Sequence, residues 1–176
     1  MKSPKVSLSK FEQEIDLEEL FGVDLSDDDS LKQAIGQVLI DRMLERVDSG
    51  RGIGGVKLKS PYSKEYSKSL EFKAAGKSRG KVNMSLTGDM LASINLISTD
   101  GNKIKIGIED EDQIPKAYNH QTGDTVPARP FFGFTKSELA DIKKKFAPKI
   151  KTAVREGETA KDRLAVSLIK DIDDGD

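Results

Sequence analysis

The sequence predicts an α+β fold, in which a small antiparallel sheet built on a central hairpin (about 93–108) packs against an N-terminal and a C-terminal helix. The hairpin is predicted because alternating apolar residues flank Asp100-Gly101-Asn102, a strong turn signal. The helices are predicted because apolar residues recur at helical spacing from Leu31 to Val47 and again from Leu139 to Val154.

An acidic cluster opens the first of these helices. Ser30 follows Asp27-Asp28-Asp29 and is a good N-cap, because its hydroxyl can accept a hydrogen bond from a backbone N–H of the first turn. The three carboxylates suit the positive end of the helix dipole. We expect this helix to run to about Ser49 and to stop at Gly50.

Loops and short elements follow the first helix. Residues 50–62 are rich in glycine and contain Pro61, so they are expected to form a loop. Residues 63–82 are basic and have few apolar positions, which leaves a helix or an extended arm open. A turn at 87–89 then leads into a helical turn at 90–94, just before the hairpin.

The C-terminal half is predicted to be helical apart from one extended run. A short helix is expected at 115–120, and two prolines keep residues 125–134 extended. A capping box at 135–138 opens the second long helix, which Pro148 should bend or interrupt. A last helix is expected at about 159–172.

These elements suggest one domain with distinct ends. The domain covers 30–155, after an acidic N-terminal arm, 1–29, and before a C-terminal helix and acidic tail, 156–176. The arm holds nine acidic and three basic side chains. We expect a short amphipathic helix in it, ending near Gly22. The apolar face of that helix comprises Phe11, Ile15, Leu17, Leu20 and Phe21.

Composition excludes several classes of site. The 176 residues include no cysteine, which rules out disulfides, thiolate zinc sites and cysteine nucleophiles. No apolar run approaches the roughly 18 residues that a membrane span needs, and the N-terminus lacks the apolar stretch of a secretory leader. No membrane partner is therefore expected.

Two glycine-containing motifs resemble nucleotide sites without their context. Gly50 to Gly55 fits G-x-G-x-x-G, but it follows a predicted helix rather than a strand, and it leads into a loop. Gly76-Lys77-Ser78 resembles the end of a phosphate-binding loop, but Glu71 occupies the position of the required first glycine. We therefore expect flexible loops and no cofactor.

Metal and hydrolase chemistry also lack support. The four acids Glu109 to Asp112 are consecutive, so they point to different sides of the chain and fit a solvated turn better than a cation site. His120 is the only histidine, and no G-x-S-x-G elbow is present. A hydrolase using His120 stays as a third reading, but a structural or interface histidine is favoured. We expect no enzyme and no metal.

Residues 51–81 carry nine basic and two acidic side chains. Tyr62, Tyr66 and Phe72 are interleaved with them and could stack on bases or pack on protein. A solvated surface is the default, and a DNA-binding adaptor is the alternative function. The candidate DNA-facing residues are Lys57, Lys59, Lys64, Lys68, Lys73, Lys77, Arg79 and Lys81.

Five motifs occur in a recognisable order between about residues 31 and 155. They are Pro61 to Tyr66, Ser85 to Ile94, the hairpin, Ala117 to Gly123, and the run Val126-Pro127-Ala128-Arg129-Pro130-Phe131-Phe132-Gly133. In this order they resemble the virion-morphogenesis or tail-completion proteins of tailed bacteriophages, a group that includes Mu-like head–tail proteins. The last run is the most specific part of the resemblance.

The resemblance implies a structural assembly protein whose 30–155 segment is a tail-completion domain. Such subunits form a closed ring, commonly hexameric, at the head–tail junction or the tail terminus, and DNA passes through the hole. The implied partners are further copies of the chain, the phage connector or neck proteins, the tail tube proteins and, non-specifically, genomic DNA. The implied location is the virion, after assembly in the bacterial cytoplasm.

The run Val126–Gly133 supplies most of the expected subunit interface. Its prolines stiffen an extended segment, its phenylalanines are apolar anchors, and Arg129 can pair with a carboxylate on a neighbour. The alternative for the phenylalanines is burial in the chain's own core, which we expect for one of the two. The candidate interface residues are Pro127, Arg129, Pro130, Phe131, Phe132, His120 and Tyr118.

Overall fold

The computed structural model describes residues 6–7, 10–58, 61–80, 82–84 and 88–173, and its fold is α+β as predicted. Four strands form one antiparallel sheet in the order β1-β2-β4-β3. The hairpin prediction is confirmed, because β3 and β4 pair across the Asp100–Lys103 turn. The strands are β1 (Val6–Ser7), β2 (Glu12–Asp16), β3 (Ile94–Asp100) and β4 (Lys103–Ile108).

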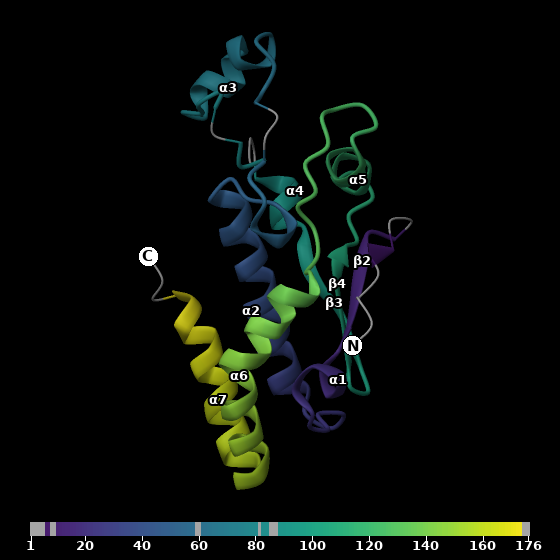
Figure 1. Cartoon of the computed structure of the whole chain (residues 1–176), viewed down its shortest axis with the longest axis vertical. Coiled ribbons are helices and arrows are strands. Elements are labelled where there is room, and N and C mark those ends of the chain that lie inside the picture. The colour runs from purple at the N-terminus through teal and green to yellow at the C-terminus, as the bar shows by residue number, and fades with distance from the viewer. Residues whose placement is uncertain (1–5, 8–9, 59–60, 81, 85–87, 174–176) are drawn as a thin grey trace.

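The helices lie along one side of this sheet and at its ends (Figure 1). The described α-helices are α1 (Leu17–Phe21), α2 (Asp29–Asp48), α3 (Leu70–Ala74), α4 (Asp89–Ala92), α5 (Ile114–Thr122), α6 (Lys136–Glu156) and α7 (Glu158–Asp173). Two short 3-10 helices, η1 (Ile53–Gly55) and η2 (Tyr66–Lys68), interrupt the loop between α2 and α3.

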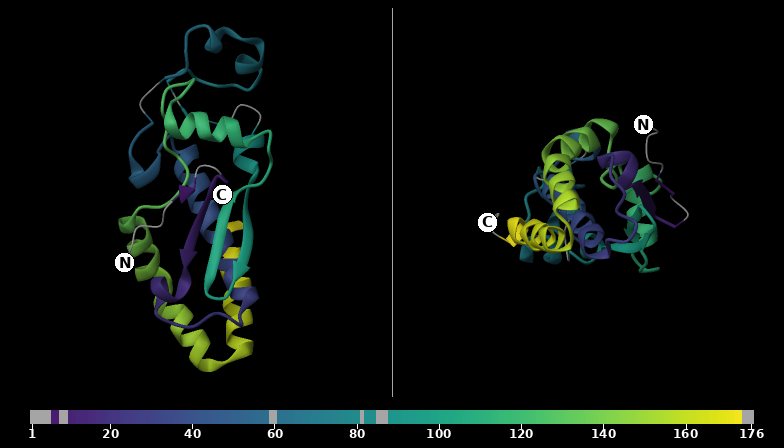
Figure 2. Two further views of the ribbon diagram at one scale, coloured as in Figure 1. Left: turned by 90° about the vertical axis from the view of Figure 1, so that its right-hand side faces the viewer. Right: turned by 90° about the horizontal axis from the view of Figure 1, so that it is seen from below.

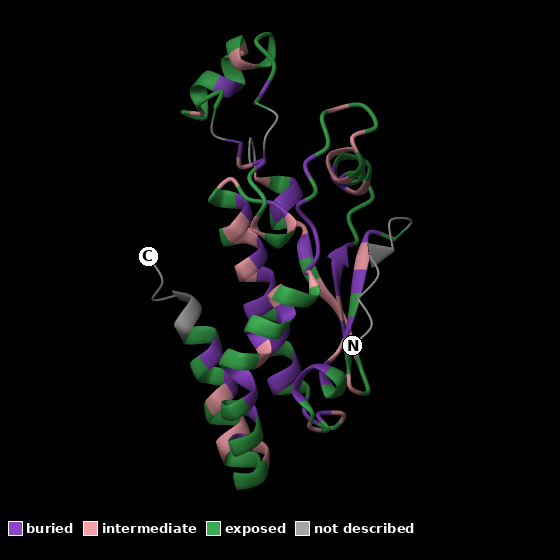
Figure 3. Ribbon diagram, in the orientation of Figure 1, coloured by how far each residue is buried: buried purple, intermediate pink, exposed green. Residues whose placement is uncertain are grey.

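Helix α2 is the central element of the core. It packs against β3 and β4 on one side and against α7 on the other, so it is buried on several faces (Figure 3). Even Lys32 is only 2% exposed. Its Nζ donates to the backbone oxygens of Ser26 at 2.8 Å and Gly101 at 3.1 Å, and it forms an ion pair with Asp29. These contacts tie the start of α2 to the hairpin turn.

The strands contribute an isoleucine face to this core. Ile104 and Ile106 on β4 are fully buried, and Ile15 on β2 lies opposite Ile104 in the sheet. The other face of the sheet carries charged side chains, including the ion pair between Glu14 and Lys103 at 2.8 Å. One face of the sheet is therefore packed and the other is solvated, as expected for a short antiparallel sheet.

The acidic N-terminal segment is not an arm, and this domain boundary was wrong. Residues 12–16 form β2, which pairs with β4 in the interior of the sheet. Phe11 is fully buried against the rings of Phe131 and Phe132, at centroid distances of 6.0 and 4.8 Å. Burial of these apolar residues overrides the helix expected from residue 11, and only its second half, α1, forms. Gly22 ends α1 as expected, with φ of 70°.

Two further details of the helices concern the N-cap of α2 and Pro148. The N-cap of α2 is Asp28 rather than Ser30, because the helix already begins at Asp29 and the Asp28 carboxylate accepts a hydrogen bond from the N–H of Leu31. Pro148 does not interrupt α6, which continues to Glu156. Pro148 and Lys144 are both exposed, so solvent can bind the carbonyl that the proline leaves without a donor. The capping box of α6 at Thr135 and Glu138 is confirmed.

Residues 61–80 form a small lobe that projects from one end of the molecule (Figures 1 and 2). The N–H of Tyr62 donates to the backbone oxygen of Arg79 at 3.3 Å and closes the lobe at its base. Three aromatic rings of the lobe pack together with centroids 5.2–5.5 Å apart: Tyr62 and Phe72, which are buried, and Tyr66, which is exposed. Leu70 at the start of α3 is 80% exposed.

We predict that Phe11→Ala lowers the free energy of unfolding by about 3–5 kcal/mol, because it leaves a cavity between two buried rings. Leu70→Ala is the matched control and should cost less than about 0.5 kcal/mol, since the leucine is already solvated. Urea unfolding of the two variants measures both values. A Phe11 variant as stable as the wild type would contradict the placement of Phe11 and the N-terminal segment in the core.

Candidate functional site

The extended run Val126–Gly133, called the strap below, begins near α5 and ends at the start of α6. Phe131 and Phe132 are both fully buried and pack on Phe11. Their assignment as intersubunit anchors is therefore wrong. Core burial was expected for one of them, and the structure uses both, because residue 11 belongs to the same core.

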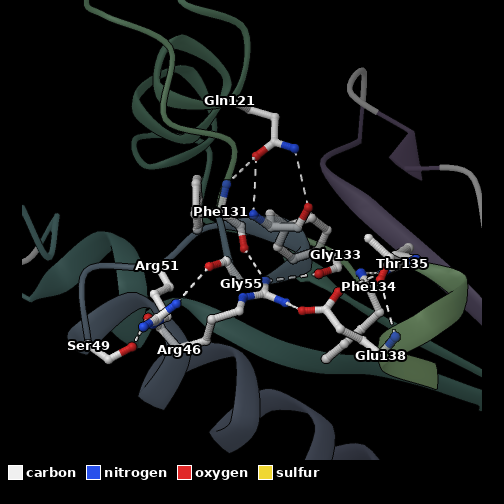
Figure 4. Close-up of polar contacts among 12 residues, drawn as sticks. Arg46, Ser49, Arg51, Gly55, Gln121, Phe131, Gly133, Phe134, Thr135 and Glu138 are labelled. Atoms are coloured by element: carbon white, nitrogen blue, oxygen red, sulfur yellow. Dashed lines mark hydrogen bonds and ion pairs between the residues drawn. The ribbon is translucent and has the colours of Figure 1, made fainter. Parts of the chain in front are cut away.

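Arg46 on α2 fixes the C-terminal half of the strap (Figure 4). One guanidinium nitrogen, Nη2, donates to the backbone oxygens of Phe131 at 2.6 Å and Gly133 at 3.0 Å. The other, Nη1, forms an ion pair with Glu138 on α6. The planar guanidinium offers several donors in a fixed geometry, so one side chain joins three segments.

Glu138 is the anionic end of this cluster. Burial alone would raise the pKa of its carboxyl group, but the hydrogen bond from the N–H of Thr135 and the charge of Arg46 outweigh burial, so the pKa lies below its usual value. Glu138 therefore remains ionised at neutral pH, and it serves the capping box and Arg46 together.

Two glutamines bind the backbone of the strap and of Phe134, the residue that follows it. The Oε1 of Gln121 on α5 accepts from the N–H groups of Phe131 and Phe132, both at 3.1 Å, and its Nε2 donates to the Phe132 oxygen (Figure 4). Buried Gln13 on β2 accepts from the N–H of Phe134. These side chains provide hydrogen-bond partners for backbone groups that are not paired in a sheet. The backbone groups can therefore be buried without the free-energy cost of an unmade hydrogen bond.

The glycine-bearing loop after α2 packs directly on the strap. The N–H of Ile53 donates to the Pro130 oxygen at 2.9 Å. A Cβ at Gly52 would lie 2.2 Å from that same oxygen, so only glycine allows the two backbones to approach. The Gly50–Gly55 run therefore allows close packing of two backbones, and its only regular element is the short 3-10 helix η1. A dinucleotide site would instead place such glycines between a strand and the start of a helix.

The N-terminal half of the strap borders a pocket of about 550 Å³ between the lobe and α5, called the Arg129 pocket. The lobe contributes one wall, and the strap, α5 and residues around α4 contribute the others. The lining residues are Tyr62, Ser63, Tyr66, Met84, Gly88, Met90, Gln113, Lys116, His120, Val126, Pro127 and Arg129.

Arg129 lies in the wall of this pocket and not on the outer surface. It is 4% exposed, its N–H donates to the His120 oxygen at 2.6 Å, and its guanidinium lies 5.3 Å from the centre of the Tyr62 ring. Burial lowers the pKa of Arg129. Arg129 lines the pocket, so a neighbour's carboxylate would have to enter the pocket to reach it, and the pairing of Arg129 with a neighbour stays a prediction.

His120 is half-buried in the same wall, with Nδ1 3.5 Å from a guanidinium nitrogen of Arg129. Burial lowers the pKa of its imidazole, and the positive charge of Arg129 lowers it further. The ring is therefore neutral at pH 7. The other candidate interface residues, Tyr118, Pro127 and Pro130, are exposed, and their assignment to an interface stays a prediction.

The structure divides the candidate DNA-facing residues into three groups. Lys64, Lys68, Lys73 and Arg79 are exposed on the lobe, where Lys77 is half-buried and bonded to Asn83. Lys57 is exposed on the glycine loop. Lys59 and Lys81 lie outside the described residues.

Several residues of the site were not singled out from the sequence. Arg46 occupies an ordinary position in an amphipathic helix, and Gln13 and Gln121 carry no motif.

The acidic residues Glu109 to Asp112 are exposed, as a solvated turn requires. Within the described ranges, no group of three or more His, Cys, Asp or Glu side chains is placed to hold a metal ion.

Comparisons with models of protein families, with curated proteins and with solved structures found no match. Among the helices in the described part of the chain, none has the length and apolar character needed to span a membrane.

We predict that Arg46→Ala lowers the free energy of unfolding by about 2–4 kcal/mol at pH 7, because it leaves Glu138 and two strap carbonyls without their donor. Arg51→Ala, which removes an exposed side chain that donates to the Gly55 oxygen, should cost less than about 1 kcal/mol.

The difference between wild type and Arg46→Ala should narrow below about pH 4.5, the ordinary pKa of a glutamate carboxyl. A carboxyl whose pKa is lowered in the folded state stabilises that state above its unfolded pKa, and this contribution is lost as pH falls through the folded pKa. Urea unfolding across pH 3–7 measures the difference. A gap that is constant with pH would contradict the pairing of Arg46 with Glu138.

Proposed function

We propose that this protein is a structural subunit of a bacteriophage ring at the head–tail junction or tail terminus, through which DNA passes. The order of its motifs, which resembles the tail-completion family, supports this function. The observation that carries it is the projecting lobe, which exposes a leucine and a basic surface that one copy of the chain leaves uncovered.

The charge and shape of the lobe suit contact with a different surface of another copy. Five basic and two acidic residues between 61 and 80 give it a net charge of +3. The rest of the chain carries acidic segments, including exposed Glu109 to Asp112. Contact between unlike patches generates a closed ring when the rotation between subunits closes. Charge complementarity between the patches would set the register of such a contact.

The strap supports assembly in another way. Its C-terminal half is held by Arg46, Gln121 and the glycine loop, so the exposed Pro130 is presented on a fixed backbone. A preformed surface loses little conformational entropy on binding. Pro127 and Pro130 are the strap residues that we assign to the subunit interface.

A DNA-binding adaptor is the second candidate. The favouring observation is that Lys64, Lys68 and Lys73 are all exposed on one small lobe. Phosphate contacts need several cations on one surface, and the lobe provides them. Leu70 argues against DNA as the principal partner, since a solvated leucine gains more from an apolar protein surface than from phosphates.

We predict that the purified protein forms rings at high concentration or when added to its neighbouring phage components. Six copies of the 19.3 kDa chain would have a mass of about 116 kDa by light scattering. Leu70→Asp should weaken association, because it places an unpaired charge in the contact. Val166→Asp is the matched control, an exposed apolar residue on α7 away from the lobe, and should leave association unchanged.

The same two variants should differ in joining purified heads to purified tails, with Leu70→Asp defective and Val166→Asp active. A protein that stays monomeric at all concentrations and also fails to join heads or tails would contradict the proposed function. Equal behaviour of the two variants would remove the lobe from the interface.

The adaptor predicts tight DNA binding at low salt with a steep decline as salt rises. The triple variant Lys64→Glu, Lys68→Glu, Lys73→Glu should then abolish binding, while a triple change on α6, Lys143→Glu, Lys144→Glu, Lys145→Glu, should have a smaller effect. Fluorescence anisotropy with a labelled duplex measures both. The absence of binding at about 50 mM salt would exclude the adaptor.

A further inference from the structure

The Arg129 pocket has an unequal distribution of charge. Arg129 and Lys116 both line it, and none of the described residues in its lining is an aspartate or a glutamate. Its volume of about 550 Å³ lies within the range of small-molecule sites, roughly 300–1,000 Å³. A cavity of this size with cationic groups and no lining carboxylate favours an anionic ligand.

The position of Arg129 favours a planar anion. Its N–H bond to the His120 oxygen and the Tyr62 ring beside its guanidinium hold the residue in one place. A guanidinium held in advance loses little rotamer freedom when it binds, and its parallel N–H groups match the two oxygens of a carboxylate.

His120 adds a polar group without adding charge at neutral pH. Its pKa is lowered by burial and by the charge of Arg129, so the neutral ring can donate or accept one hydrogen bond at the pocket wall. An anion bound nearby would favour the protonated ring and raise this pKa.

The remaining walls are largely apolar. Met84 and Met90 are buried beside the cavity, and Val126 and Pro127 line the strap side. Tyr62 and Tyr66 present aromatic rings from the lobe. Methionine side chains adapt to irregular shapes, and such walls suit the apolar body of a ligand better than a small hydrated ion.

We propose that the Arg129 pocket binds a carboxylate carried on an apolar or aromatic body. Arg129 holds the carboxylate, Lys116 and His120 stand at the wall, and the methionines and tyrosines contact the body. Binding of a free carboxylate here is independent of the proposed ring, whereas binding of a neighbouring subunit's side chain rests on it. The carboxylate comes either from a free small molecule or from an acidic side chain of a neighbouring subunit, and the chemistry of recognition is the same.

The test uses the single histidine of the chain as a reporter. 3-Phenylpropionate is titrated into the full-length protein while the ring proton signals of His120 are followed by NMR, with 3-phenylpropanamide as the neutral control. We expect the acid to shift these signals saturably and to raise the pKa of His120, and the amide to bind at least about tenfold more weakly because it has no charge for Arg129.

Two variants localise the binding. Arg129→Gln should lower affinity for the acid about tenfold or more. Because Arg129 is buried and its loss could disturb folding, Val126→Trp is the second variant, since it fills the cavity from a half-buried position and keeps the charges. Lys170→Gln on α7, which removes an exposed lysine outside the pocket, should leave affinity unchanged. Circular dichroism verifies that each variant is folded.

The outcomes distinguish the two sources of the carboxylate from each other and from results that contradict the proposal. If the acid binds and also dissociates preformed assemblies, the natural carboxylate comes from a neighbouring subunit. If the acid binds and leaves assemblies intact, the natural ligand is a free molecule. Equal binding of acid and amide, or unchanged His120 signals at millimolar acid with folded protein, would overturn the proposal. Ring formation is measured without 3-phenylpropionate, so a failure to form rings can be distinguished from a failure to bind the carboxylate.

Discussion

The contact on which the C-terminal half of the structure depends is the buried guanidinium of Arg46. It joins the central helix α2 to the strap and to the first turn of α6, where its partners lie 85 to 92 residues further along the chain. Because Glu138 also closes the capping box, the start of α6 and the path of the strap are fixed by one cluster of charges. The placement of Phe131 and Phe132 in the core follows from that path.

The strap illustrates how an extended segment is buried without strand partners. Two prolines remove donors, and the remaining N–H and C=O groups need partners once they leave water. Gln121 and Arg46 supply them from two different elements, and Gln13 from a third element does so for Phe134, the next residue. The N-terminal half of the strap has fewer such contacts and borders a cavity, so one short segment serves the core at one end and a pocket at the other.

The sequence was most informative where local signals and burial agree. The hairpin turn at Asp100-Gly101-Asn102 and the capping box at Thr135 act through neighbouring residues, and both were predicted correctly. Strand β2 was missed because its side chains are mostly acidic, and its place in the sheet depends on pairing with β4, about 90 residues away. The Arg129 pocket could not be predicted for the same reason, since its walls come from four segments that only the fold brings together.

The closure of the lobe by Tyr62 and Arg79 makes residues 61–80 a self-contained insertion in the chain. The two ends of the insertion meet at hydrogen-bond distance, so its length and sequence can vary without altering the path of the chain through the body. Substitutions on the exposed side of the lobe can therefore change its surface while the core around α2 keeps its shape. A lobe of different sequence could be exchanged at this base, so the exposed surface at this end of the molecule can be altered in one step.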